Sequence, residues 1–209
     1  SSQPLCFNLF AELQCDLSLA SKVFRELTSG RVESVTAIDF EHSPGRDDPR
    51  YLGDRSAFDV YVSFCSKSGT QGFIGIEVKY HENLRGQAAD HRERYDEVAN
   101  GMKCFKRDRR AQLQSQPLQQ IWRDHLLAGS LRKADGYEEG FFVFLYPGGN
   151  THCSEAIAQY RDCLTNTSTF DAWILEDVAA KVKQFTQGEW IDMFIDRYLD
   201  FTKVANAGE

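Results

Sequence analysis

The sequence predicts an α/β protein whose central mixed sheet is flanked by helices. Helical and strand periodicities follow one another in the order helix, three strands, two helices and strand along residues 5–147. Helical spacing returns three more times, near residues 154–165, 175–185 and 189–203. With 209 residues, 42% of them hydrophobic and 12% aromatic, we expect one globular domain over residues 1–209. Its core is expected over about 7–147 and its C-terminal helical part over about 151–205.

The first half of the core begins with a helix over Leu5–Leu27, where large apolar residues recur at helical spacing. A strand is predicted over Val32–Phe40, followed by a loop at 41–50 that is rich in proline, glycine and aspartate. Two further strands, Ala57–Phe64 and Gln71–Tyr80, are separated by a short glycine-containing segment. We expect these two strands to form an antiparallel hairpin.

The second half of the core alternates charged and apolar elements. A charged helix is predicted over Gly86–Phe105, followed by a basic turn at Lys106–Arg110. Another helix is expected to begin at Gln116-Pro117 and to run through Arg132. A continuous apolar run, Glu139–Tyr146, predicts a strand that is buried on both faces. The helices after it are expected to pack on the core or to form a lid.

Charged residues interrupt the apolar pattern of the hairpin. Because strand side chains alternate between faces, Glu77 and Lys79 share one face, and Asp59 is expected on that same face. The other face is predicted to be apolar, with Phe58, Val60, Val62 and Phe64 opposite Ile74, Ile76, Val78 and Tyr80. Burying a carboxylate and an ammonium is costly unless they are paired or bind a metal. From the residues alone, an ordinary ion pair and a metal site both explain the pattern.

The order of these residues carries a family resemblance. Asp59 followed by Glu77-Val78-Lys79 resembles the motif of the PD-(D/E)XK nuclease superfamily, which has the restriction-endonuclease-like fold. The segments 40–46, 53–55, 74–82 and 117–124 are similar to a bacterial branch of restriction endonucleases, and the resemblance covers roughly residues 7–147. The sequence departs from the motif at one place, because Ala57-Phe58 stand where a proline is usual before the aspartate.

The resemblance implies a metal-dependent nuclease that hydrolyses phosphodiester bonds. Its metal, Mg²⁺ or Mn²⁺, would be held by the carboxylates of Asp59 and Glu77 and by the backbone carbonyl of Val78. Such an ion binds a phosphate oxygen and lowers the pKa of a bound water. Lys79 is implied to orient that water and to offset negative charge in the transition state.

Two further catalytic residues are implied by the same resemblance. Members of the superfamily often place a glutamate from the first helix near the metal, and Glu12 is the candidate here. A solvated surface acid explains Glu12 equally well. Many members also present a glutamine or a basic residue from the helix that begins near Pro117, and Gln119 or Gln120 fits that role.

DNA is the expected partner, although the net charge of −7 argues against binding through bulk charge. Basic residues are instead concentrated in residues 85–110. Contacts with phosphates are predicted at Arg46, Arg55, Arg107, Arg109 and Arg123. An ordinary solvated surface remains an alternative for each of these arginines.

Several function classes are disfavoured. The sequence has neither a G-x-S-x-G elbow nor a P-loop, so we expect neither serine-hydrolase chemistry nor an NTP motor. No apolar run reaches the ~18 residues of a membrane span. The six cysteines are scattered without a C-x-x-C pair, which disfavours zinc. Together with the lack of a signal-peptide pattern, this predicts a cytoplasmic protein.

The leading hypothesis is a restriction or defence endonuclease acting on DNA. Two alternatives remain at this point: a catalytically silent nuclease-like module that binds DNA or protein, and a repair or recombination nuclease for branched or single-stranded DNA. The intact Asp59, Glu77 and Lys79 set argues against a silent module. DNA specificity, strandedness, and the choice between monomer and homodimer stay open.

Overall fold

The computed structural model describes residues 2–86 and 88–200. Five strands form one sheet in the order β1 to β5: β1 (Ser34–His42), β2 (Phe58–Cys65), β3 (Gln71–Val78), β4 (Glu139–Tyr146) and β5 (Phe170–Ile174). The first three strands pair antiparallel, and β3, β4 and β5 pair parallel, which confirms the predicted mixed sheet. The predicted hairpin is β2–β3, with Val62 opposite Ile74.

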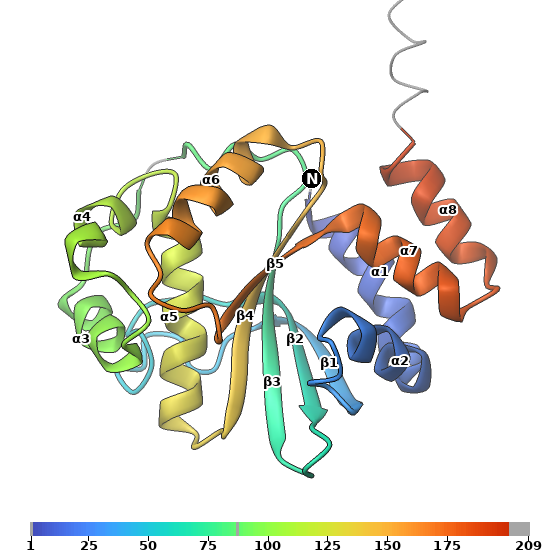
Figure 1. The fold of residues 1–209 in the computed structure, drawn as a ribbon, viewed down its shortest axis with the longest axis horizontal. Helices are drawn as coiled ribbons and strands as arrows, with labels where there is room; N and C mark the ends of the chain where they lie inside the picture. The colour runs from blue at the N-terminus through green and yellow to red at the C-terminus, as the bar shows by residue number, and fades with distance from the viewer. Residues whose placement is uncertain (1, 87, 201–209) are drawn as a thin grey trace, which may run out of the picture.

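Helices cover both faces of this sheet (Figure 1). One face carries α1 (Ser2–Cys15), α2 (Leu17–Leu27), α7 (Leu175–Phe185) and α8 (Glu189–Tyr198). The other carries α3 (Glu93–Met102), the short η1 (Arg107–Arg109) and α4 (Arg110–Leu113), α5 (Gln119–Ala134) and α6 (Thr151–Asp162). None of the helices in the described residues is long and apolar enough to cross a membrane.

Alternation along the strands builds a separate core on each face. Ile74 and Ile76 of β3 lie in the core beneath α1, α2 and α7, whereas Phe73 lies in the core beneath α3, α5 and α6. Strand β4 is buried on both faces, as its continuous apolar run predicts. The expected α/β arrangement is therefore confirmed, with β3 and β4 at its centre.

Two helix predictions were wrong in their extent. The single helix expected over Leu5–Leu27 is two helices, because Asp16 ends α1 and caps α2, accepting a hydrogen bond from the Leu19 N–H at 2.9 Å. The helix expected over 86–105 covers only Glu93–Met102. It ends where Lys103 has a left-handed φ of 56°. Gln87, inside the predicted range, lies outside the described residues, as do residues 201–205 of the predicted C-terminal part.

Strand β5 is not predicted by the sequence pattern. Only five residues long, it contains Asp171 and lies at the edge of the sheet, paired on one side with β4. A segment this short has too few residues for its alternation to stand out.

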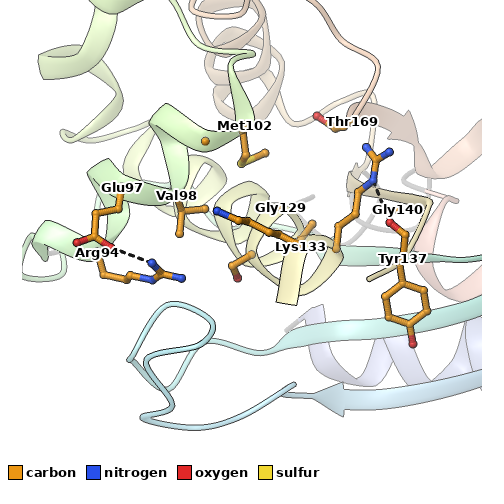
Figure 2. A pocket seen from close by; sticks show the side chains of 13 residues that line it. Arg94, Glu97, Val98, Met102, Gly129, Lys133, Tyr137, Gly140 and Thr169 are labelled. Carbon is orange, nitrogen blue, oxygen red and sulfur yellow. Dashed lines mark hydrogen bonds and ion pairs between the residues drawn. The ribbon is translucent and has the colours of Figure 1, made fainter. Parts of the chain in front are cut away.

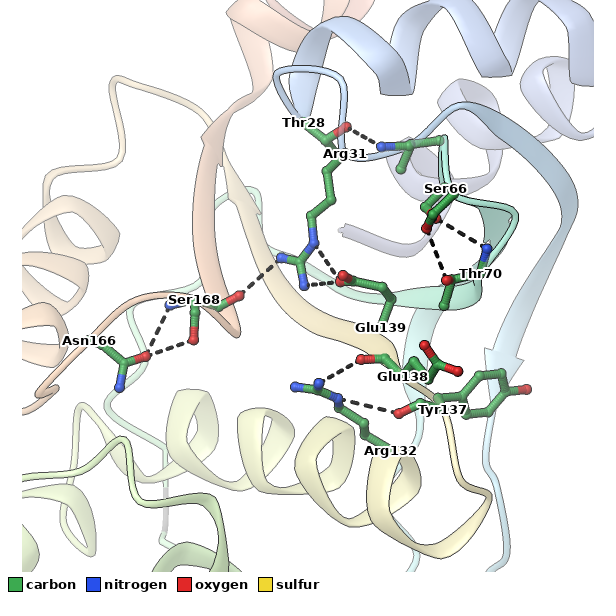
Figure 3. Close-up of polar contacts among 12 residues, drawn as sticks. Thr28, Arg31, Ser66, Thr70, Arg132, Tyr137, Glu138, Glu139, Asn166 and Ser168 are labelled. Carbon is green, nitrogen blue, oxygen red and sulfur yellow. Dashed lines mark hydrogen bonds and ion pairs between the residues drawn. The ribbon is translucent and has the colours of Figure 1, made fainter.

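Segments far apart in the sequence are joined at the edge where β4 and β5 begin (Figure 3). Arg31, just before β1, donates to Glu139 Oε2 from Nε at 2.9 Å and from Nη2 at 2.5 Å. Its third contact is to the carbonyl of Ser168 at 3.0 Å. These contacts lie at the edge where β4 begins. The charged residues Glu77 and Lys79 lie at the opposite edge, where β3 ends.

Candidate active site

The pairing between β2 and β3 opens at Asp59. The last pair in the register is Val60 with Ile76, so the Val78 N–H has no backbone acceptor on β2. The Asp59 carboxylate takes that place and accepts the hydrogen bond through Oδ2 at 2.7 Å. This contact holds the Asp59 carboxylate beside Val78 at the end of β3. Val78 directly follows Glu77 in the chain.

One strand-face prediction was wrong. Phe58 does not share a face with Val60 but packs in the opposite core with Tyr61 and Phe73. Its ring covers Gly75, where an added Cβ would lie 2.4 Å from the Phe58 Cε1 atom. The residue that replaces the usual proline of the motif therefore fills the space that glycine leaves on the neighbouring strand.

Glu77 and Lys79 form a buried ion pair beneath α5. Lys79 Nζ donates to Glu77 Oε1 at 2.5 Å, and their side chains are 11% and 8% exposed, respectively. Gln120 of α5 donates to the same oxygen from Nε2 at 2.7 Å. The Glu77 carboxylate is thus oriented by one charged and one neutral donor.

A third carboxylate, Asp124, faces the same region from α5. It is 3% exposed, and its Oδ2 is buried without a hydrogen-bond partner in the described part of the chain. Burial, with the negative charge of Asp124 as the next cause, raises the pKa of Glu77 to about 7. Burial likewise raises the pKa of Asp124 to about 7, against the opposing effect of Arg123 and Lys79.

The charges of these groups are strongly coupled. Burial and then the charge of Glu77 raise the pKa of Asp59 to about 7. Burial alone would lower the pKa of the Lys79 ammonium, but Glu77 outweighs it through charge and hydrogen bonding, and the pKa of Lys79 rises. Lys79 is therefore positively charged at neutral pH, among carboxyl groups that repel one another when ionised.

The donor set suits a hard divalent cation. Asp59 Oδ1 and Glu77 Oε2 accept no hydrogen bond from the described residues, so one oxygen of each carboxylate is available to a ligand. Within residues 2–86 and 88–200, no group of three or more His, Cys, Asp or Glu side chains could hold a metal ion. Two carboxylates therefore need a backbone carbonyl and waters to complete the shell, which is how proteins usually hold Mg²⁺.

The structure separates the two glutamine candidates. Gln120 reaches Glu77, whereas the Gln119 amide bonds the backbone of Ala89, accepting from its N–H at 2.7 Å and donating to its carbonyl. Of the two candidates, Gln120 therefore contacts the carboxylate pair, and Gln119 ties α5 to the segment before α3. Adjacent helix residues point about 100° apart, so only one of them can face the sheet.

Glu12 lies elsewhere. Its side chain is exposed on α1 and lines a surface cavity with Trp190 and Arg197 of α8. No contact joins it to Asp59 or Glu77 among the residues that are described. The expectation that Glu12 reaches the metal is not supported by this placement.

The predicted DNA-contacting arginines are mostly free of strong partners. Arg46, Arg55, Arg107 and Arg109 are exposed. Arg55 pairs weakly with Asp47 at 3.6 Å, and Arg109 with Asp108 at 3.8 Å. Arg123 differs, because it is half-buried, its Nε has no partner in the described region, and its charge acts on Glu77 and Asp124.

Asp124 was not singled out from the sequence. The signal that points to it is its spacing from Gln120, since residues four apart share one face of a helix. Once Gln120 is placed against Glu77, Asp124 is required to face the same side.

The chain matches a known protein family. A family model described as the PD-(D/E)XK nuclease superfamily matches residues 1–200, well beyond the 7–147 of the sequence resemblance. No curated protein and no solved structure gives a match. The match spans nearly the whole chain, and the fold is the mixed sheet that this superfamily requires. The chain therefore belongs to the PD-(D/E)XK nuclease superfamily.

Proposed function

We propose that the protein is a divalent-metal-dependent endonuclease that hydrolyses DNA phosphodiester bonds, with Asp59, Glu77 and Lys79 as its catalytic set. The observation that carries the proposal is the junction at the end of β3. There Asp59 is held by the Val78 N–H, Glu77 is held by Lys79 and Gln120, and each carboxylate keeps one oxygen available. An ordinary surface ion pair would not need two other carboxyl groups, Asp59 and the buried Asp124, beside it.

The metal would be held by Asp59, Glu77 and the carbonyl of Val78. When bound, Mg²⁺ or Mn²⁺ supplies Lewis-acid stabilisation of the phosphate and a water of lowered pKa. Lys79 keeps its proton at neutral pH, so it acts as a positive charge beside the scissile phosphate rather than as a base. Gln120 restrains the Glu77 carboxylate so that its second oxygen stays directed away from Lys79.

DNA is the substrate class we propose, and restriction or defence is the role. The similarity of segments 40–46, 53–55, 74–82 and 117–124 to a restriction-endonuclease branch supports that role. The exposed arginines Arg46 and Arg55 precede the Asp59 strand, and Arg107 and Arg109 follow the Lys79 strand, so phosphates on either side of the cut are expected to meet them. A cytoplasmic location fits this role.

The test is plasmid nicking with Mg²⁺ or Mn²⁺, compared with the same reaction in a chelator. Lys79→Ala should lower the cleavage rate by about 10²–10³-fold, because it removes one preorganised charge from the site. Its DNA affinity should stay close to that of wild type, whereas its melting temperature should fall, because Glu77 loses the partner of a buried ion pair. Lys67→Ala, which removes an exposed lysine from the β2–β3 turn, is the matched control and should cleave normally.

The outcomes separate the proposal from its alternatives. Cleavage at equal rates by wild type and Lys79→Ala would place the active site elsewhere. Wild-type protein that binds DNA but is inert on double-stranded, single-stranded and branched substrates with either metal would indicate a silent binding module. Cleavage confined to branched or single-stranded DNA would instead indicate a repair or recombination nuclease.

A further inference from the structure

A cavity of about 340 Å³ lies between α3 and α5, beside the start of β4 (Figure 2). Lys133, near the C-terminal end of α5, lines it, whereas Gln120 near the other end of α5 touches Glu77. At 1.5 Å per residue, these two positions are about 20 Å apart along the helix. The cavity is therefore a different site from the carboxylates at the end of β3.

One side of the cavity is apolar. Val98 and Met102 of α3 and Ala128 of α5 line it. Gly129 allows the two helices to approach there, since a Cβ at this position would lie 2.2 Å from Met102 Sδ. This apolar side suits an aliphatic or aromatic body.

The rim is positively charged. It carries Arg94, Arg132 and Lys133 with a single acid, Glu97, which leaves a net charge of +2 from three cations and one anion. Arg94 pairs with Glu97 at 2.8 Å, and Arg132 donates to backbone carbonyls in the turn between α5 and β4. Lys133 is exposed and has no hydrogen bond or ion pair with any described residue, and its side chain extends across the opening toward α3 (Figure 2).

We propose that this cavity binds an amphipathic anion. An apolar or aromatic body would lie on Val98 and Met102, and a carboxylate, sulfonate or phosphate group would pair with Lys133. A free ammonium beside an apolar wall binds an anion better than a neutral molecule of the same shape, because the charged contact adds to the apolar burial. The inference does not depend on the nuclease proposal, because it uses none of the residues at the end of β3.

The test uses two fluorescent probes with similar aromatic bodies. 8-Anilinonaphthalene-1-sulfonate carries a negative charge, and N-phenyl-1-naphthylamine does not. Wild-type protein should bind the sulfonate at one site per chain and about tenfold more tightly than the neutral probe, a difference of about 1.4 kcal/mol. Equal affinity for both probes would overturn the assignment of an anion site.

Two variants locate the binding. Lys133→Glu should weaken binding of the sulfonate by at least about tenfold and leave binding of the neutral probe unchanged, because it replaces an attracting charge with a repelling one. Gly101 lines the cavity, and a Cβ added there meets no atom within 4 Å. Gly101→Leu should therefore fill part of the cavity and abolish binding of both probes. Ala134→Leu, on the exposed end of α5, is the control and should bind like wild type.

Thermal melts show whether each variant remains folded. A folded Gly101→Leu variant that still binds the sulfonate would place the probe on another surface and would overturn the proposal. Competition with the bound sulfonate probe then distinguishes two classes of natural ligand. Decanoate and adenosine monophosphate both carry an anionic group, but one has an aliphatic body and the other an aromatic one. Displacement of the sulfonate probe by either one supports the site, and failure of both overturns it.

Discussion

The two carboxylate oxygens of Asp59 have different surroundings. Oδ2 completes the hydrogen bonding of β3 by accepting from Val78, while Oδ1 has no partner among the described residues. Burial and the Glu77 charge make its ionised form unfavourable, which raises the pKa from 3.8 to about 7. The free energy of unfolding in the absence of metal should therefore depend on the charge at this one position.

Asp59→Asn should stabilise the metal-free protein at neutral and higher pH. The wild-type carboxyl binds its proton more tightly in the folded than in the unfolded state, so stability falls as pH rises from about 4 to about 7. The Asn variant keeps an oxygen that accepts from the Val78 N–H, and its stability does not fall with pH through this position. We expect it to be more stable by about 1–2 kcal/mol near pH 8, with the difference vanishing near pH 4.

Thermal melts across this pH range measure the effect, and about 1 kcal/mol corresponds to roughly 2–4 °C for a chain of this size. Addition of Mg²⁺ should raise the melting temperature of wild type but not of the Asn variant, because the variant lacks one ligand. Parallel pH curves for the two proteins would show that Asp59 is not held in a repulsive site.

The two neighbouring glutamines should respond differently to truncation. Gln120→Ala removes a donor to Glu77 and should lower the cleavage rate by about tenfold, with stability nearly unchanged. Gln119→Ala releases both backbone groups of Ala89 and should lower the free energy of unfolding by about 1–2 kcal/mol. Cleavage assays and urea denaturation distinguish them, and an exchange of the two effects would mean that α5 is rotated from its described orientation.

At the scale of elements, the end of the β2–β3 hairpin depends on the close contact of Phe58 with Gly75. Gly75→Ala would place a methyl group 2.4 Å from the Phe58 ring, in a part of the core with no open space. We expect a loss of about 1–3 kcal/mol in stability, as for other overpacked cores. Because Phe58 adjoins Asp59, metal affinity measured by calorimetry should fall as well.

The matched control for this change is Gly101→Ala. Gly101 lies near the end of α3, where an added Cβ meets nothing within 4 Å. There alanine should leave stability unchanged or raise it by about 0.5–1 kcal/mol through helix propensity. Equal stability of the two alanine variants in urea denaturation would show that the contact between β2 and β3 is looser than described.

At the scale of the whole molecule, a chain with net charge −7 needs local positive surface to bind DNA. We expect Arg107→Glu with Arg109→Glu to weaken DNA binding and to reduce the slope of log affinity against log salt by about two, one for each lost phosphate contact. A double variant with the same charge change, Lys22→Glu with Lys181→Glu, lies on α2 and α7 of the opposite layer and is the control. Equal salt slopes for the two double variants would remove η1 from the DNA interface.

The sequence alone was sufficient for features that depend on local periodicity. Alternation of apolar residues predicted the β2–β3 hairpin, and a continuous apolar run predicted β4. Strand phase also placed Glu77 and Lys79 together, because a period of two leaves side chains two apart on one face. Their contact at 2.5 Å agrees with that phase.

Only the tertiary structure decided which residues of other elements meet this pair. Helix α5 is buried almost all around, so its apolar pattern does not show which side faces the sheet. Packing against β4 sets its rotation, and this rotation brings Gln120 and Asp124 to Glu77 and sends Gln119 to Ala89. The position of Phe58 over Gly75 was likewise decided by packing. Glycine leaves a space on β3, and the sequence does not identify which neighbouring side chain fills it.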